Sequence, residues 1–195
     1  MGKKGKSICL FSSKGGTGKS SIATLLSGFF AMQDKKVLII DFDLSFGSIG
    51  LLLNKESNKN IYDLYSDYSN NKFTDIGNYV TKYNDNILFL ASSSDPRQGV
   101  KINDAFIKFI LEKSIYSYDY IIIDTNSDCS NVNIDLLDIV DNVLFIMNND
   151  LLNIKNMRSM INIFKVAGKT NYKVLLNEST NPYKNYYSLY DIKKM

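Results

Sequence analysis

The sequence contains no histidine and only two cysteines, Cys9 and Cys129. Without histidine, the protein has neither a histidine-dependent catalytic triad nor a zinc site built on imidazole ligands. The two cysteines lie far apart in the sequence and form no Cys-x-x-Cys pair, which argues against a disulfide framework. The sequence therefore excludes histidine-dependent catalysis and imidazole zinc sites, and a disulfide-stabilised fold is not expected.

Long apolar runs are also missing. No run approaches the roughly 20 residues needed to cross a bilayer. Residues 1–6 are basic and lack the apolar stretch of a signal peptide. Such a start could touch phosphate or anionic lipid, but we expect a flexible, solvated segment. We therefore expect a cytoplasmic protein without an integral membrane segment.

Arginine is scarce, because Arg97 and Arg158 are the only two among 23 basic residues, and the net charge is +3. This composition does not mark a dense nucleic-acid-binding patch. A chain of 195 residues, 45% of them hydrophobic, suits one α/β domain over residues 1–195 with a buried core.

What the sequence does contain is a glycine-rich loop, residues 12–20, directly after a short apolar run. Three glycines remove the Cβ atoms that would keep backbone N–H groups away from phosphate oxygens: Gly15, Gly16 and Gly18. Lys19 supplies a positive charge for the β- and γ-phosphates, and Ser20 supplies a hydroxyl for Mg²⁺ at the start of a helix. Thr17 and Ser21 complete the predicted set. The loop predicts binding of ATP or ADP with Mg²⁺; the alternative is a glycine-rich turn with two surface lysines.

Apolar runs and amphipathic segments alternate along the rest of the chain. The runs predict strands at 7–11, 37–40, 87–91, 120–124, 143–147 and 172–176. The segments between them predict helices at 19–32, 61–68, 102–116 and 152–166. On the first helix, the predicted buried face consists of Ile22, Leu25, Leu26, Phe29 and Phe30. The alternation predicts an α/β fold with a doubly wound, mainly parallel sheet flanked by helices.

Polar residues fall at the predicted carboxyl ends of several strands, where doubly wound sheets bind ligands. They are Ser13, Asp41, Asp43, Asp124 and Asn177. Asp124 closes an apolar strand and is predicted to hold Mg²⁺ directly or through water; the alternative is an aspartate that caps a turn. Asp41 and Asp43 share one face of an extended segment. One can support the metal while the other orients a water for attack on the γ-phosphate, or the pair can be purely structural.

The loop departs from the standard P-loop at Ser13, where glycine is expected, and adds a lysine at Lys14. The resulting Lys-Gly-Gly-x-Gly-Lys-Ser resembles the deviant Walker A motif of the ParA/MinD family of ATPases. The resemblance implies that Lys14 reaches across a nucleotide-sandwiched homodimer to phosphate in the partner's site. It also implies that Asp43 is tied to hydrolysis, which leaves Asp41 beside the metal.

The expected catalytic residues are then Lys14, Lys19 and Asp43, and the expected metal ligands are Ser20, Asp41 and Asp124. Residues 44–50 and 125–131 would be switches I and II, which the γ-phosphate orders and hydrolysis loosens.

The segment 41–54, followed by 60–64, resembles the CpaE/TadZ group of pilus-assembly ATPases. That group carries an Asp-x-Asp-Leu-x-Phe-Gly segment that runs into a leucine-rich stretch. ParA partition proteins more usually have Asp-x-Asp-Pro-Gln there, and the C-terminal amphipathic membrane helix of MinD is not visible. The resemblance implies partners among pilus, secretion or polar-localisation proteins, which could recruit the chain to the membrane or cell pole.

Asn177 matches the family asparagine whose amide reads adenine; the alternative is an asparagine in a turn. Relatives in the family continue past this position, so we expect a C-terminally truncated chain in which 178–195 is a polar, tyrosine-rich tail. Its tyrosines resemble those ending bacterial tyrosine kinases: Tyr183, Tyr186, Tyr187 and Tyr190. Those kinases lack a lysine at the position of Lys14, which argues against kinase activity.

Three function classes follow. The first is a slow ATPase that acts as a dimerisation switch for spatial positioning. The second is a scaffold that keeps nucleotide without hydrolysing it. The third is a partition ATPase whose binding to nonspecific DNA would be sensitive to salt. The complete motif set favours the first class.

Overall fold

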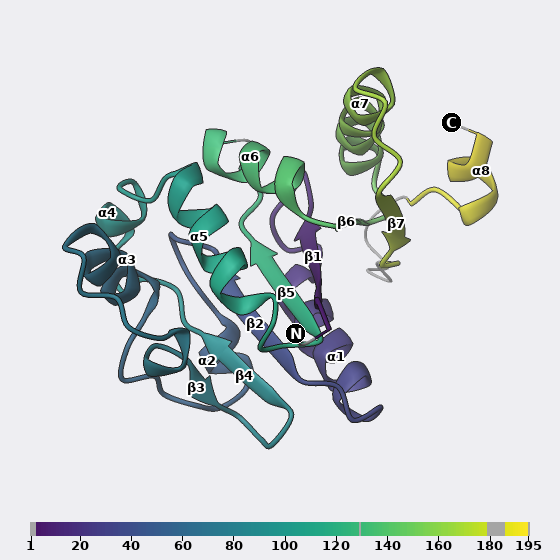
Figure 1. Cartoon of the computed structure of the whole chain (residues 1–195). Helices are drawn as coiled ribbons and strands as arrows, with labels where there is room; N and C mark the ends of the chain where they lie inside the picture. The colour runs from purple at the N-terminus through teal and green to yellow at the C-terminus, as the bar shows by residue number, and fades with distance from the viewer. Residues whose placement is uncertain (1–2, 129, 179–185, 195) are drawn as a thin grey trace.

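A computed structural model describes residues 3–128, 130–178 and 186–194. The chain is built around a seven-stranded sheet in the order β3-β4-β2-β5-β1-β6-β7 (Figure 1). Neighbouring strands run parallel except β3 and β4, which are antiparallel. The strands are β1 (Lys6–Phe11), β2 (Val37–Phe42), β3 (Thr81–Lys82), β4 (Ile87–Leu90), β5 (Tyr120–Thr125), β6 (Asn142–Met147) and β7 (Tyr172–Leu176). The predicted doubly wound, mainly parallel sheet is confirmed.

Helices connect the strands and cover both faces of the sheet (Figure 1). They are α1 (Lys19–Ala31), α2 (Ile49–Leu52), α3 (Ile61–Ser69), the 3₁₀ turn η1 (Ile76–Asn78), α4 (Pro96–Gly99), α5 (Asp104–Ser114), α6 (Asn131–Ile139), α7 (Leu151–Val166) and α8 (Leu189–Lys194). Among the described residues, no helix is both long and apolar enough to cross a membrane.

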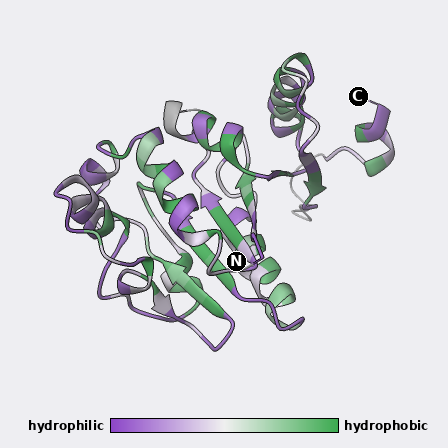
Figure 2. Cartoon of the chain, in the orientation of Figure 1, coloured by the Kyte–Doolittle hydropathy of each residue, from purple (hydrophilic) through white to green (hydrophobic). Residues whose placement is uncertain are grey.

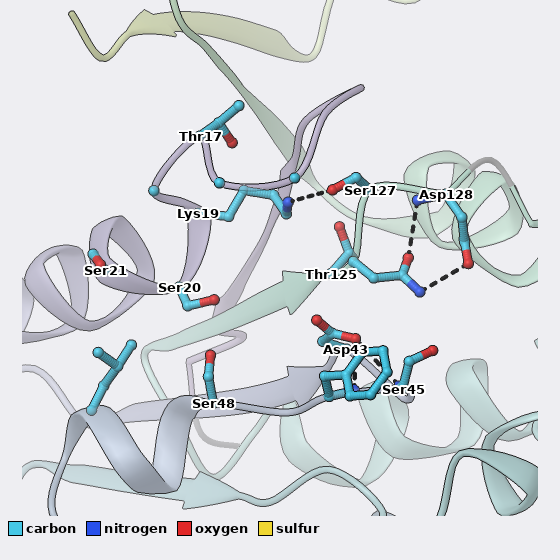
Figure 3. A pocket seen from close by; sticks show the side chains of 16 residues that line it. Thr17, Lys19, Ser20, Ser21, Asp43, Ser45, Ser48, Thr125, Ser127 and Asp128 are labelled. Carbon is cyan, nitrogen blue, oxygen red and sulfur yellow. Dashed lines mark hydrogen bonds between the residues drawn. The ribbon is translucent and has the colours of Figure 1, made fainter. Parts of the chain in front are cut away.

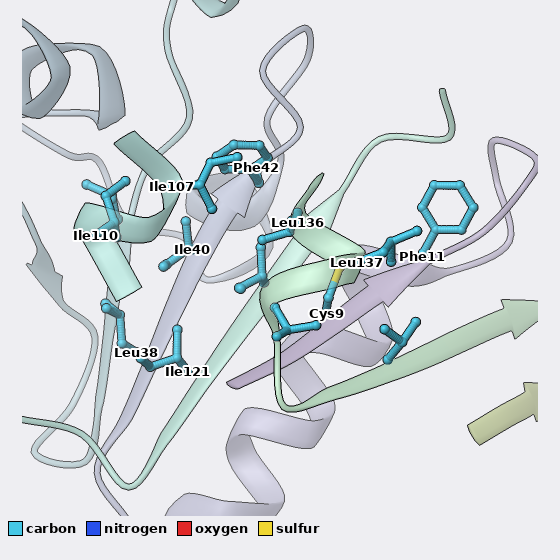
Figure 4. Close-up of a cluster of buried hydrophobic side chains, with 14 of the residues drawn as sticks. Cys9, Phe11, Leu38, Ile40, Phe42, Ile107, Ile110, Ile121, Leu136 and Leu137 are labelled. Carbon is cyan, nitrogen blue, oxygen red and sulfur yellow. The ribbon is translucent and has the colours of Figure 1, made fainter. Parts of the chain in front are cut away.

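The central strands are buried on both faces, which explains their continuous apolar runs. All six residues of β2 are buried, and Figure 2 shows the central strands as mostly hydrophobic. On one face, residues of β2 and β5 pack with α5 and α6, as Figure 4 shows for Leu38, Ile40, Ile107 and Leu136. On the other face, Leu10, Ile39 and Ile122 pack with α1 and α2. The sheet is thus the middle of three layers.

The register of the sheet aligns the site residues. Asp124 of β5 is paired with Leu10 of β1 on one side and with Asp41 of β2 on the other. The carboxyl ends of these three strands therefore lie at one edge, directly beside the loop that follows β1.

The predicted buried face of α1 is partly wrong. Leu25 is 73% exposed and Phe29 is 58% exposed. The helix packs through Ala23 and Ser27, with Ile22, Leu26 and Phe30 beside them. The buried face of α1 includes two small residues, Ala23 and Ser27. A prediction based only on the spacing of large apolar residues therefore assigned the wrong centre to this face.

The start of the chain is also more ordered than predicted. Gly5 is buried and donates its N–H to the Ile115 carbonyl at 2.7 Å. Lys6, whose N–H donates to the Asp119 carbonyl at 2.9 Å, begins β1. Gly5 and Lys6 are therefore not part of the flexible segment that we expected over residues 1–6.

The expected tail, 178–195, lies partly outside the described residues, and so does Tyr183 of its tyrosine cluster. Of the described part, Tyr187 donates its N–H to the Asn149 carbonyl at 2.9 Å. Tyr187 and Ile192 pack against the core on the α7 side.

Candidate nucleotide-binding site

A cavity of about 520 Å³ opens at the carboxyl ends of β1, β2 and β5 (Figure 3). Its lining comes from the three segments that the sequence singled out: residues 15–21; Asp43, Ser45, Phe46, Ser48 and Leu52; and residues 125–128. The expected nucleotide loop and both expected switches therefore meet at one cavity.

The loop after β1 has the backbone geometry that its glycines predict. Gly16 and Gly18 have φ angles of 73° and 92°, in the left-handed region that side chains disfavour. Gly18 is the N-cap residue of α1, so the start of the helix, where free N–H groups attract anions, faces the cavity. Ser13, at the position where a standard P-loop has glycine, has a hydroxyl without a hydrogen-bond partner among the described residues.

Lys19 lies at the inner end of the cavity and is only 8% exposed. Its Nζ donates a hydrogen bond to Ser127 Oγ at 3.2 Å (Figure 3). Burial lowers the pKa of Lys19, while the nearby carboxylates of Asp124 and Asp43 oppose this shift. A buried ammonium with one neutral partner is suited to bind the charge of a phosphate.

Asp124 is fully buried, and neither of its carboxylate oxygens has a partner in hydrogen-bonding geometry among the described residues, although the Ser20 hydroxyl lies close enough to lower its pKa. Burial raises its pKa to about 6, against the effects of the Ser20 hydroxyl and the Lys19 ammonium. Buried carboxylate oxygens without partners are costly unless a cation or proton occupies them. The residues present therefore fit a Mg²⁺ ion.

No group of three or more acidic, cysteine or histidine side chains among the described residues could hold a metal by itself. Mg²⁺ does not require such a group, because it keeps several waters and takes one or two protein ligands together with phosphate oxygens.

Asp41 has a role that the sequence did not reveal. It is buried, and its Oδ2 accepts the N–H of Ile49 at 2.9 Å, at the start of α2. Its Oδ1 accepts the N–H of Asp43 at 3.3 Å. Burial raises the pKa of Asp41 to about 7, which the Ile49 N–H opposes and the Asp124 charge reinforces. Asp41 thus shapes switch I from within, and its expected contact with the metal stays a prediction.

Asp43 lines the cavity, as a residue that acts on the γ-phosphate or its attacking water must. Its Oδ1 accepts the N–H groups of Ser45 and Phe46 at 3.3 and 3.2 Å. The carboxylate therefore also organises the turn that begins switch I.

Four expected site residues are not part of the cavity lining: Lys14, Asp41, Asp124 and Asn177. Lys14 Nζ forms an ion pair with Asp150 Oδ2 at 3.2 Å, at the start of α7. Asn177, directly after β7, donates its Nδ2 to the Thr17 carbonyl at 2.9 Å. The proposed reach of Lys14 to a partner's site and the reading of adenine by Asn177 both stay predictions.

The sequence reasoning missed the part played by Asn126, Ser127, Asp128 and Asn133. These polar residues follow a buried strand, and an Asn-Ser-Asp run there is a signal for side-chain-closed turns. Only the structure shows that Ser127 points at Lys19.

Comparisons with known proteins agree with this geometry. A family model described as an AAA domain (AAA_31) matches residues 5–177. An uncharacterized ATP-binding protein of Methanocaldococcus jannaschii is 26% identical over 172 residues, covering 87% of this chain and 63% of that protein. The septum site-determining protein MinD of Helicobacter pylori is 27% identical over 118 residues, covering 60% of this chain and 43% of that protein. The matches thus span less than two thirds of these relatives.

Solved structures show the same fold. MinD of Pyrococcus horikoshii, complexed with Mg-ADP, superposes with a TM-score of 0.79 at 17% identity, covering 97% of this chain and 76% of that one. A ParA family ATPase of Chlorobium tepidum gives a TM-score of 0.78 at 20% identity, covering 90% of this chain and 75% of that one.

Proposed function

We propose that the chain, which belongs to the family of the AAA domain model that matches residues 5–177, is a P-loop ATPase of the ParA/MinD type, and that it works as a slow, Mg²⁺-dependent dimerisation switch. One observation carries the proposal: the buried carboxylate of Asp124, whose oxygens have no partner in hydrogen-bonding geometry among the described residues, lies beside Ser20 and Lys19, which line the cavity. A buried carboxylate without partners costs stability unless a cation binds it, so the observation supports binding of Mg-nucleotide. A scaffold that keeps Mg-nucleotide would use Asp124 in the same way, and hydrolysis is proposed on the position of Asp43 in the cavity lining.

The chain's own residues supply binding and orientation. Backbone N–H groups of residues 15–20 and the Lys19 ammonium hold the phosphates, while the Ser20 hydroxyl and Asp124 hold the metal. When bound, Mg²⁺ would neutralise charge on the β- and γ-phosphate oxygens. Asp43 orients the attacking water. Its two backbone hydrogen bonds fix the carboxylate in place before nucleotide binds.

Dimerisation is proposed to exchange the partner of Lys14. In the single chain the Lys14 side chain is 40% exposed and its ammonium is paired with Asp150. Partly exposed ion pairs contribute only about 0–1 kcal/mol. Lys14 can therefore leave Asp150 for a phosphate across the dimer interface at little cost.

We place the switch in pilus or secretion-system assembly, on the resemblance of residues 41–54 to the CpaE/TadZ group. The partners would then be polar-localisation or pilus proteins, which recruit a cytoplasmic ATPase to the membrane or cell pole. Partition of DNA is the second candidate. A plasmid partition protein of Borrelia burgdorferi gives a TM-score of 0.76 at 25% identity, covering 98% of this chain and 87% of that one.

Replacing Asp43 with alanine tests the proposal. Asp43→Ala should slow ATP hydrolysis about a hundredfold or more and trap a dimer with ATP and Mg²⁺, measured by phosphate release and light scattering. A mutant that stays monomeric with ATP would contradict the trapped-switch mechanism. Salt-sensitive binding of the trapped protein to nonspecific DNA would favour partition over pilus assembly.

A further inference from the structure

Asn133 is a polar residue that is buried although it does not line the nucleotide cavity. It lies in the first half of α6, is 3% exposed, and belongs to the same helix as the core residues Leu136 and Leu137. Burying an amide among apolar groups is costly unless its hydrogen bonds are made.

Among the described residues, the side-chain hydrogen bonds of Asn133 all go to switch II. Its Nδ2 lies 2.6 Å from Asn126 Oδ1, 2.7 Å from Asp128 Oδ1 and 2.9 Å from the Asp128 carbonyl oxygen. Asn126 Nδ2 also donates to Asp128 Oδ2 at 2.9 Å, and Asp128 Oδ1 accepts the N–H of Ser130 at 3.2 Å. The side chains thus close the turn 126–128 around one amide. We call these three residues, Asn126, Asp128 and Asn133, the switch II ring.

Ser127 is the residue that this ring holds in place. It stands between Asn126 and Asp128, and its Oγ accepts the hydrogen bond from Lys19 Nζ at 3.2 Å (Figure 3). A Cβ added at Gly15 would lie 3.8 Å from the same Oγ. Ser127 is therefore seated against the phosphate loop. Because a P-loop lysine lies at the β- and γ-phosphates, this is the end of the cavity where the terminal phosphate binds.

We propose that Asn133 is a positioning residue that, through the switch II ring, fixes Ser127 at the terminal-phosphate end of the cavity and so lets the chain distinguish a nucleoside triphosphate from a diphosphate. The inference rests on the proposed function, because it assumes that nucleotide binds at Lys19. Asn133 itself does not line the cavity and acts only through the turn.

The physical argument is one of preorganisation. A loop whose turn is already closed loses less conformational entropy when it contacts the terminal phosphate. A diphosphate does not reach that end, so its affinity should depend little on the ring. Loss of the ring should therefore act on triphosphate binding selectively.

The test measures binding of fluorescent ADP and of the non-hydrolysable imido analogue of ATP, each with Mg²⁺, to the full chain. Asn133→Asp keeps the shape of the side chain, removes its donors and places a carboxylate beside Asp128. We expect the variant to bind the ATP analogue about tenfold more weakly, with ADP affinity within about twofold of wild type. The ratio of the two affinities is unaffected by any unfolded fraction of the sample.

Rescue and control variants separate positioning from general destabilisation. Asn133→Asp combined with Asp128→Asn reverses donor and acceptor, since the amide at 128 can now donate to the carboxylate at 133, and should restore most of the ratio. The matched control is Asn171→Asp, because Asn171 Nδ2 donates to the Val140 carbonyl at 3.2 Å, at the opposite end of α6. It should leave the ratio unchanged.

An unchanged ratio in Asn133→Asp, or an equal loss in Asn171→Asp, would overturn the positioning role while leaving the ATPase proposal intact. A wild-type chain that binds neither nucleotide would overturn the proposed function, and this inference with it.

Discussion

Two buried carboxyl groups, Asp41 and Asp124, lie in register on neighbouring strands at the floor of the site. One is bonded to the backbone of switch I and the other has no hydrogen-bond partner among the described residues. The two carboxyl groups are therefore proposed to have different roles: Asp41 supports switch I, and Asp124 is available to bind a metal. Both groups have raised pKa values, about 7 for Asp41 and about 6 for Asp124.

These pKa values predict an unusual dependence of stability on pH. In the unfolded chain both groups lose their protons near the ordinary value of 3.8, whereas the folded protein keeps them up to about pH 6 or 7. The folded state therefore binds more protons in this window. Without Mg²⁺, the free energy of unfolding should fall as pH rises from 4 to 7, by up to about 1.4 kcal/mol per pH unit for each group.

Urea denaturation in EDTA at pH 5 and pH 7.5 measures this effect. Asp41→Asn keeps an oxygen to accept the Ile49 N–H but cannot titrate, so it should flatten the slope. A variant whose slope equals that of wild type would show that Asp41 is ionised throughout this range in the folded protein.

At the scale of elements, replacing either of two glycines with alanine is expected to change the free energy of unfolding, in opposite directions for the two positions. A Cβ at Gly28, in the last turn of α1, would have no atom within 4 Å. A Cβ at Gly47, in switch I, would lie 2.2 Å from Ser92 Cβ and 2.8 Å from Asp41 Oδ2. The first glycine is replaceable and the second is required by close packing.

Gly28→Ala should raise the free energy of unfolding by about 0.5–1 kcal/mol, because alanine has the higher helix propensity. Gly47→Ala should lower it by about 1–3 kcal/mol through overpacking. Urea denaturation at pH 7.5 measures both. Destabilisation by Gly28→Ala would mean that the exposed face of α1 is covered by another surface in solution.

The central strands were predictable because burial on both faces requires a continuous apolar run. The two-residue edge strand β3 was not predicted, and the edge strand β7 is partly exposed although its apolar run was recognised. β7 was predicted with its observed bounds, Tyr172–Leu176, and the other predicted strands differ by one or two residues at their ends. The short helices α2 and α4 were not predicted. They contain too few residues for a periodic pattern, and α2 begins where the Asp41 carboxylate accepts the Ile49 N–H, a contact between segments.

The same division holds for the site. The position of residues 15–20 and Asp43 at the cavity could be predicted because motif spacing and strand ends are local properties of the sequence; their roles stay predictions. The switch II ring could not, because it depends on how α6 packs over the sheet and turns Asn133 inward. The same is true of Lys14 and Asp150, which are paired only because the loop after β1 and the start of α7 meet in space.

At the scale of the whole molecule, the sheet brings the loop after β1, the two switches and the start of α7 to one edge. Lys14 stands at the rim of that edge, outside the lining of the cavity. A residue so placed is of little use to its own nucleotide but can meet one presented by a second copy. The central claim is therefore that ATP assembles two chains through Lys14.

Light scattering after size-exclusion chromatography tests this claim most directly. Wild type, Lys14→Ala and the control Lys72→Ala, which replaces an exposed lysine far from the cavity in sequence, are each measured with Mg²⁺ and either ADP or the imido analogue of ATP. We predict twice the monomer mass only with the triphosphate, for wild type and the control, and monomer in both nucleotides for Lys14→Ala. A Lys14→Ala variant that dimerises like wild type would contradict the account.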